Sequence, residues 1–336
     1  MGVGIIGTGS YLPDIVLSND ELGDRLGVQP DWIMQKTAIR ERRVAAADEA
    51  TSDLATVAVQ KALESAQVPA GEVDIIVLAT STPDQPMPAT ACLVQAKLSA
   101  HRAAAFDVDA VCTGFIYGLV VARGMLLADP RARTALVIGA DTYSRILNYE
   151  DRRTAVLFGD GAGAVVLSKT EGATGISVAT LGSDGRHADY VQIPAGGSRR
   201  PPSPSSIAAG EHYFAMRGGD VRRLANEVFP NVVKELVAAD GTDLQNLDLI
   251  VPHQANGVML ADWERELGVV AGVMHRTVER YGNTGAASVP VTLDDAVCSD
   301  LLHDGSRVLL VAFGGGMTWG GVALTWGNGK TQGGSV

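Results

Sequence analysis

The residue with the most suggestive chemical setting is Cys112. The apolar stretch 103–111 is typical of a strand and the apolar run 116–127 is typical of a buried helix, so the cysteine lies where a strand turns into a helix. The partial positive charge at a helix N-terminus favours the thiolate, which is the reactive form of cysteine. Cys112 is therefore a candidate nucleophile, although most free cysteines are buried structural residues.

Two further polar residues follow segments of the same kind. His253 ends the apolar run 247–253, and Asn283 lies in the glycine-containing segment 281–288. Ligands of open α/β sheets gather at the carboxyl ends of strands, where we expect all three residues to lie. Taken singly, such a histidine is more often a satisfied core residue and such an asparagine a turn residue. The order Cys, His, Asn also occurs in papain-like proteases, but their Cys-Gly-Ser-Cys-Trp type of signature is absent.

Strands and helices alternate in the elements that must position these residues. Apolar, β-branched runs predict strands buried on both faces, and apolar residues at helical spacing predict the helices between them. The expected strands are 3–9, 73–80, 134–140, 247–253, 307–313 and 320–326, and the expected helices are 51–66, 90–98, 116–127 and 220–237. This alternation predicts an α/β fold with a largely buried sheet covered by helices.

A faint internal repeat suggests two halves. The matching stretches are 73–80 with 247–253 and 136–167 with 309–324. We therefore predict a first half over residues 1–170, which carries Cys112, and a second half over residues 171–336, which carries His253 and Asn283.

Composition excludes several classes of protein. The 336-residue chain has a formal net charge of −11, which argues against nonspecific nucleic-acid binding because such binding needs a basic face. The three cysteines form no CxxC pair or Cys/His cluster, so neither a zinc site nor a disulfide framework is predicted. The N-terminus lacks the basic region of a signal peptide, and no uninterrupted apolar run is long enough to span a bilayer. A cytoplasmic protein that does not enter the membrane is predicted.

Three segments invite a local interpretation. The basic run 39–44 is expected to form a solvated face, and the Pro/Ser/Gly-rich stretch 195–210 is expected to be an exposed loop. The glycine-rich turn 158–164 leads into a strand rather than a helix, so close backbone packing explains it better than dinucleotide binding.

Four segments, in this order along the chain, resemble the signature blocks of β-ketoacyl-ACP synthase III. They are 109–115, 251–256, 281–290 and 313–320, and together with Trp32 and 158–164 they extend the resemblance over essentially the whole chain. The resemblance implies a thiolase-type fold, with two related halves in a five-layered αβαβα arrangement, and a homodimer. It also implies an acyltransferase that uses acyl-CoA and malonyl-ACP and needs no metal or organic cofactor.

The resemblance gives roles to the three residues singled out above. Cys112 would carry the acyl group, and the backbone N–H groups of Cys112 and Gly315 would bind the oxyanion. Neutral His253 and the Asn283 amide would donate hydrogen bonds to the enolate that remains when a malonyl thioester loses CO₂. The carbanion would then attack the acyl group on Cys112, which starts a fatty-acid or polyketide chain.

A substrate-binding set follows from the same resemblance. Its members are Trp32, Lys36, Met87, Arg152, Asn256 and Phe313. Lys36 stands where an arginine is usual, which keeps the charge but loses the planar fork. Met87 matches a residue that reaches across the dimer to form the floor of the partner's acyl pocket, and this flexible side chain suggests a roomier pocket than phenylalanine would leave.

One departure concerns the acyl carrier protein. Val258 stands where the family usually has an arginine on the docking face, which leaves Arg222 and Arg223 as candidates for contact with that acidic partner. Together with Lys36, Met87 and the inserted stretch 195–210, this departure also supports a second hypothesis, in which an acyltransferase of specialised metabolism moves the acyl group from Cys112 to a non-malonyl acceptor. A third, a catalytically dead dimer partner, conflicts with the complete Cys/His/Asn set.

Overall fold

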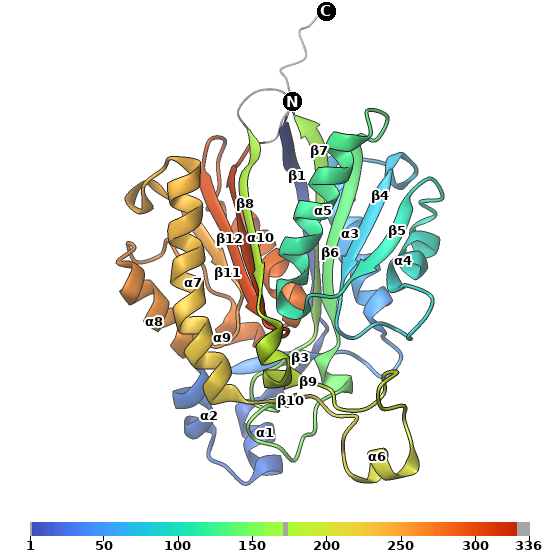
Figure 1. Cartoon of the computed structure of the whole chain (residues 1–336), viewed down its shortest axis with the longest axis vertical. Coiled ribbons are helices and arrows are strands. Elements are labelled where there is room, and N and C mark those ends of the chain that lie inside the picture. Colours follow the sequence, from blue (N-terminus) through green and yellow to red (C-terminus); the bar gives the residue numbers. More distant parts are fainter. Residues whose placement is uncertain (1, 171–173, 328–336) are drawn as a thin grey trace, which may run out of the picture.

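The computed structural model describes residues 2–170 and 174–327. Two sheets form its centre (Figure 1). The first sheet has the spatial order β1 (Gly2–Tyr11), β7 (Gly161–Thr170), β6 (Thr134–Asp141), β4 (Ile75–Ala79) and β5 (Ala104–Val108). The second has the order β8 (Gly175–Ser183), β13 (Thr318–Thr325), β12 (Arg307–Gly314) and β11 (Leu249–Pro252).

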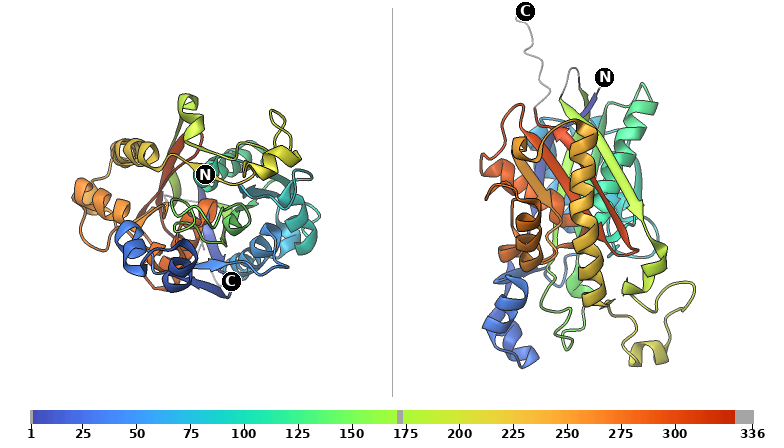
Figure 2. Two further views of the ribbon diagram at one scale, coloured as in Figure 1. Left: turned by 90° about the horizontal axis from the view of Figure 1, so that it is seen from below. Right: turned by 60° about the vertical axis from the view of Figure 1, so that its left-hand side comes forward.

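Helices form three layers around and between these sheets (Figure 2). The outer face of the first sheet is covered by α3 (Thr51–Ala66) and α4 (Thr90–Leu98), and that of the second by α7 (Gly218–Asp240) and α8 (Gly257–Leu267). Between the sheets lie α5 (Gly114–Ala128) and α10 (Ser288–Cys298). The expected α/β fold with five αβαβα layers is confirmed.

The two sheets repeat one pattern of strand directions. In the first sheet β4 pairs with β6 in parallel, β6 with β7 antiparallel, and β7 with β1 antiparallel. In the second sheet β11 pairs with β12 in parallel, β12 with β13 antiparallel, and β13 with β8 antiparallel. This is the repeat seen in the sequence. The first sheet takes its strands from residues 2–170 and the second from 175–325. The boundary between 170 and 171 stays a prediction, because residue 171 lies outside the described residues.

Burial follows this layering. β6 is buried along its whole length, as expected for a strand covered on both faces. One apolar cluster fills the space between the sheets, where Phe115 of α5 and Leu293 of α10 meet Val137 and Leu310. Two further clusters lie under α3 and under α7 with α8. These three clusters fix the strands of both sheets in place.

The central helix meets one criterion for a membrane span. Val111–Ala128 is long and apolar enough to cross a membrane by length and composition alone, although Arg123 interrupts its apolar run. Half of this stretch is buried, however, and α5 packs against strands of both sheets. Its position is that of a core helix.

Smaller elements gather at one end of the sheets, below them in Figure 1. They are β2 (Ile15–Ser18), α1 (Asn19–Leu26), α2 (Pro30–Thr37), β3 (Glu41–Val44), β9 (Val191–Gln192), α6 (Pro204–Ala208), β10 (Ala215–Met216) and α9 (Val278–Tyr281). α6 lies inside the mostly exposed stretch 195–210. Composition did not predict this helix, although Ser203 caps it and Pro204 opens it, a favourable pair at a helix start.

The basic run 39–44 is not a solvated face. Arg42 in β3 is 0% exposed, because side chains alternate along a strand and this one points inward. Its guanidinium donates to the carbonyl oxygens of Leu17 and Val156 and to Oδ1 of Asn19, at 3.3, 2.8 and 2.8 Å. The prediction for this residue was therefore wrong.

Candidate active site

A cavity of about 290 Å³ lies at the end of the two sheets and is lined by residues of both halves. Cys112, His253, Asn283 and Gly315 all line it. So do most of the expected substrate contacts and one docking candidate, namely Trp32, Lys36, Arg152, Asn256, Phe313 and Arg222. Met87 and Arg223 are not among the lining residues. The structure thus brings together the three residues that the sequence placed far apart.

Cys112 reaches the cavity through a strained turn. β5 ends at Val108, earlier than expected, and a short 3₁₀ turn, Val111–Thr113, leads into α5. Val111 has φ +48°, a left-handed conformation that is costly for a β-branched residue. Its N–H donates to Oδ1 of Asp109 at 3.1 Å, which helps to hold the turn. The nucleophile is therefore aimed by backbone geometry directly before it.

The glycine turn between β12 and β13 is fixed against this turn. A Cβ at Gly314 would come within 2.8 Å of the Cys112 nitrogen, so only glycine allows this approach. The Thr318 hydroxyl lies 3.1 Å from the Ala110 carbonyl oxygen, 3.0 Å from that of Gly315 and 3.1 Å from the Thr113 hydroxyl. Both backbone segments of the expected oxyanion hole are thus held by one threonine that the sequence analysis did not single out.

The electrostatics at Cys112 differ from the expectation. Burial raises the pKa of the Cys112 thiol to about 12, the negative charge of Asp141 acts in the same direction, and the nearby Tyr143 hydroxyl acts in the opposite direction. The prediction of a lowered pKa from the helix N-terminus alone was therefore wrong for the free protein. The cysteine is a thiol at neutral pH and must lose its proton during the reaction.

His253 follows β11 and is 1% exposed. Burial lowers its pKa to about 3, so the imidazole is neutral, as expected. Its Nδ1 lies 2.5 Å from the Ser288 Oγ, and this oxygen accepts the Gln254 N–H at 3.4 Å. Among the described residues no other acceptor lies within hydrogen-bonding distance of the Ser288 hydroxyl, so it donates to Nδ1, and the imidazole proton is on Nε2. The edge of Phe313 packs against the ring with centroids 5.5 Å apart.

The lowered pKa of His253 has a consequence for stability. In the unfolded chain a histidine has a pKa near 6.5, so below this pH the unfolded state binds a proton that the folded state, with a pKa of about 3, does not bind. The free energy of unfolding should fall by about 2 kcal/mol between pH 7.5 and 5 from this residue. Urea unfolding of the wild type and His253→Gln at both pH values measures it. Equal acid sensitivity of the two proteins would contradict a neutral buried imidazole.

Asn283 corrects the expectation that all three residues end strands. It lies between α9 and α10, in a loop joined to Phe158 by an isolated bridge. Its Oδ1 accepts the Gly285 N–H at 2.9 Å, so the side-chain NH₂ is the group oriented to donate. Gly285 has φ +59°, and a Cβ there would come within 2.2 Å of the Asp141 Oδ2. The loop needs glycine at this point to present the asparagine.

Asp141 is a buried carboxylate that sequence reasoning missed. It ends β6 and accepts hydrogen bonds from the Ala286 N–H at 2.8 Å and the Ser81 N–H at 2.8 Å. The hydroxyls of Thr80 and Thr82 donate to it at 3.1 and 2.9 Å. Burial raises its pKa to about 7. Asp141 thus links the loop behind Asn283 to the first half, and its place after an expected strand was the signal that could have found it.

The polar side chains near the cavity mouth belong to different elements. Arg152 lies over the Trp32 ring, with Cζ 5.5 Å from the centroid, and Lys36 lies at the end of α2. Asn256 caps α8, because its Oδ1 accepts the N–H groups of Val258 and Met259 and its Nδ2 donates to the Lys36 carbonyl oxygen. The substrate-binding role expected for Asn256 stays a prediction, and the structure assigns its amide to joining α8 and α2.

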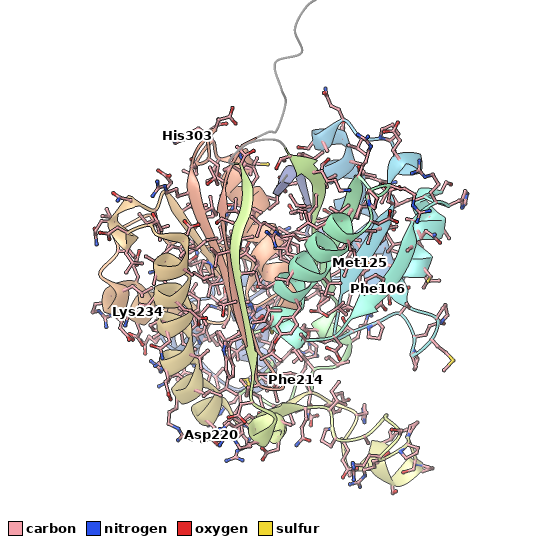
Figure 3. All side chains as sticks on the ribbon, turned by 45° about the horizontal axis from the view of Figure 1, so that its top comes forward. Phe106, Met125, Phe214, Asp220, Lys234 and His303 are labelled. Atoms are coloured by element: carbon pink, nitrogen blue, oxygen red, sulfur yellow. The ribbon has the colours of Figure 1, made fainter. Side chains whose placement is uncertain are left out.

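An aromatic cluster that the sequence analysis missed forms one wall. Tyr143 is stacked on Phe158 with centroids 4.4 Å apart, and Phe214 meets both rings edge-on at 5.6 and 4.9 Å. All three line the cavity that holds Cys112. Figure 3 shows Phe214 near the end of α7 that carries Asp220, while His303 lies at the opposite end of the molecule. The part of the cavity wall that these three residues form therefore consists of packed aromatic rings.

The two arginines expected at the docking face are already paired. Arg222 donates to Asp262 at 2.8 Å, and Arg223 donates to Asp220 at 2.7 Å. Val258, in the first turn of α8, is half-buried. Asp262 is shared with Arg265 and Asp220 with Arg217, so the face presents these shared ion pairs beside an apolar residue.

Comparison with known proteins gives one consistent result. The family model for 3-oxoacyl-[acyl-carrier-protein (ACP)] synthase III matches residues 106–185, and the model for its C-terminal part matches residues 237–326. Acetoacetyl CoA synthase NphT7 from Streptomyces sp. (strain CL190) is 50% identical over 96% of this chain and 98% of the relative. The chain belongs to the 3-oxoacyl-[acyl-carrier-protein] synthase III family. It is a condensing enzyme that takes an acyl-CoA starter.

One further relative and one crystal structure agree with this membership. Beta-ketoacyl-[acyl-carrier-protein] synthase III from Symbiobacterium thermophilum is 44% identical over 97% of this chain and 98% of the relative. The crystal structure of the synthase III from Pseudomonas aeruginosa PAO1 superposes with a TM-score of 0.90 at 39% identity, covering 97% and 98% of the two chains. The resemblance stated from the sequence is confirmed, together with the thiolase-like fold.

Proposed function

We propose that Cys112, His253 and Asn283 carry out the condensation in two stages. In the first, the Cys112 sulfur attacks the carbonyl carbon of an acyl-CoA. A bond from carbon to the Cys112 sulfur forms, the bond to the CoA sulfur breaks, and the thiol proton leaves with CoA. The N–H groups of Cys112 and Gly315 hold the oxygen that becomes negative, and the Thr318 contacts support this by fixing both segments.

In the second stage a malonyl thioester loses CO₂, and the electron pair of the broken carbon–carbon bond becomes an enolate. His253 Nε2–H and the Asn283 NH₂ donate to its oxygen, which the Ser288 and Gly285 contacts support by orienting both donors. The enolate carbon attacks the acyl group on Cys112, a β-ketoacyl thioester leaves, and the released sulfur takes up a proton. These steps use only the chain and its substrates, so the proposal includes no metal or organic cofactor.

The acyl group in this proposal is short. The space beyond Cys112 is bounded by Tyr143, Phe158 and Phe214, which are packed against one another and buried. A long chain would have to displace this cluster, and close-packed aromatic rings yield little space. Met87 suggested a roomier acyl pocket, but its side chain is 80% exposed in the single chain and does not line the cavity of that chain. Its role at a partner's pocket, and the homodimer itself, are part of the proposal.

We also propose that the malonyl group arrives on CoA rather than on the carrier protein. The observation that carries this step is the apolar Val258, which stands where the family usually has an arginine, next to Arg222 and Arg223, which are each paired with an aspartate. A net charge of −11 repels an acidic partner at long range unless free cations meet it. The Streptomyces relative is named for a CoA product, which agrees with this choice.

The test loads the protein with acetyl-CoA and then adds malonyl-CoA or malonyl-ACP, with Cys112→Ala as the inactive control. We expect CO₂ release and a β-ketoacyl-CoA product from malonyl-CoA, and loading of acetyl-CoA ahead of hexanoyl-CoA in direct competition. Turnover with malonyl-ACP but not with malonyl-CoA would reject the proposal that the malonyl group arrives on CoA. A stable acyl group on Cys112 with no CO₂ from either donor would favour the hypothesis of a non-malonyl acceptor.

A matched pair of variants makes the acceptor test sharper. Val258→Arg supplies the arginine that the family usually has on the docking face, and Val258→Leu changes size without adding charge. We expect Val258→Arg to raise turnover with malonyl-ACP several-fold and to leave turnover with malonyl-CoA unchanged, because one interface charge contributes roughly 1 kcal/mol or more. Val258→Leu should change neither.

A further inference from the structure

Tyr143 occupies an unusual position for a tyrosine. It lies in the short 3₁₀ turn Tyr143–Arg145 directly after β6 and is 1% exposed. Its ring is held by Phe158 and Phe214, and it lines the same cavity as Cys112. The packing of the ring leaves the hydroxyl little freedom to move away.

The hydroxyl itself is not satisfied by the surrounding protein. Among the described residues, the Tyr143 Oη has no partner in hydrogen-bonding geometry although it is buried. The neighbouring Ser81 Oγ is also buried without such a partner. Leaving a buried hydroxyl unpaired costs free energy, so such a group in a cavity is usually kept for something that arrives there or changes charge.

The group beside it that changes charge is the Cys112 sulfur. The Tyr143 hydroxyl is close enough to lower the pKa of this thiol, while burial and the charge of Asp141 raise it. Ser81 in turn lowers the pKa of the Tyr143 hydroxyl, which is the effect of a donor at its oxygen. Ser81, Tyr143 and Cys112 therefore stand in an order in which each hydroxyl can donate to the next group.

We propose that Tyr143 is a catalytic residue that donates its hydrogen bond to the Cys112 sulfur whenever this sulfur carries negative charge, with Ser81 supporting it. This deepens the proposed function, which makes Cys112 the acyl carrier. The sulfur is negative twice in each cycle. It becomes so when the thiol proton departs before attack on acyl-CoA, and again when the β-ketoacyl product leaves. The proton of Tyr143 stays on its oxygen throughout, so the group transfers no proton and the reaction balance is unchanged.

The test compares Tyr143→Phe with Tyr11→Phe. The first keeps the stacked ring and removes only the hydroxyl, and the second removes a remote hydroxyl that donates to Glu49. Alkylation of Cys112 by iodoacetamide near pH 8, followed on its peptide by mass spectrometry, reports the thiolate fraction, since the pH lies below the thiol pKa of about 12. We expect Tyr143→Phe to slow both alkylation and acetyl loading about 10- to 100-fold, and Tyr11→Phe to change neither.

The direction of the effect separates this role from a structural one. Loosened packing would open the cavity and speed alkylation, so an unchanged or faster rate in Tyr143→Phe overturns the proposal. If this variant is unstable, Ser81→Ala takes its place. We expect Ser81→Ala to slow the alkylation of Cys112 about 2- to 10-fold, and an unchanged alkylation rate would contradict the proposal. Failure of the wild type to load acetyl groups would reject the proposed function. The alkylation of Cys112 needs no substrate, so it tests the role of Tyr143 even in that case.

Discussion

Replacing Asn283 with aspartate is expected to slow condensation by about 10²- to 10³-fold or more while Cys112 still loads acyl groups at nearly the wild-type rate. Aspartate keeps an oxygen that can accept the Gly285 N–H, so the loop that presents residue 283 is preserved. It loses the NH₂ donor and places a negative charge where the enolate develops. The change therefore removes a stabilising group and adds a repulsive one, and both act only after the acyl group is on Cys112.

The measurement is a single turnover in which pre-acetylated protein is mixed with malonyl-CoA, and CO₂ and product are followed together. Asn231→Ala, on the exposed side of α7, is a suitable control for handling and folding. Normal decarboxylation in Asn283→Asp would remove Asn283 from the proposed mechanism. A loss of acyl loading equal to the loss of condensation would mean that the residue supports the whole cavity rather than the enolate.

Much of the fold could be predicted because burial leaves a clear pattern. The runs 73–80 and 134–140 are mostly apolar, and the structure places their apolar parts in β4 and β6, inside a covered sheet. His253 was found because it ends such a run, and Cys112 because it precedes a helix. The expectation that functional residues lie at strand ends failed for Asn283, which lies in a loop after α9. Only the family motif 281–290 indicated that Asn283 belongs to the site.

The rest could not be predicted because it depends on contacts between distant segments. The tautomer of His253 is set by Ser288, which lies 35 positions further along the chain. The pKa of the Cys112 thiol is raised first by burial and then by the charge of Asp141, which ends a different strand, whereas the local sequence shows only the helix N-terminus. Local patterns therefore locate candidate groups, whereas their protonation states follow from the packing of the two halves.

Arg42 carries the largest stability effect that we expect. Replacing it with methionine should lower the free energy of unfolding by about 2–4 kcal/mol, because the Asn19 Oδ1 and the carbonyl oxygens of Leu17 and Val156 lose their donor. Burial already lowers the pKa of this guanidinium to about 10, so the charge is held only by these oxygens and the surrounding protein. Urea unfolding at neutral pH measures the loss.

The matched control is Arg40→Met, the same change two residues earlier at an exposed position, where we expect less than about 0.5 kcal/mol. The two variants also separate charge from position, since both remove one positive charge from the same short segment. Arg42 lies against the Asn283 loop, because a Cβ at Gly159 or Gly282 would meet the Arg42 Cβ at 3.0 or 3.4 Å. Arg42→Met should therefore slow condensation as well as weaken the fold, and equal unfolding free energies in the two variants would contradict this account of β3.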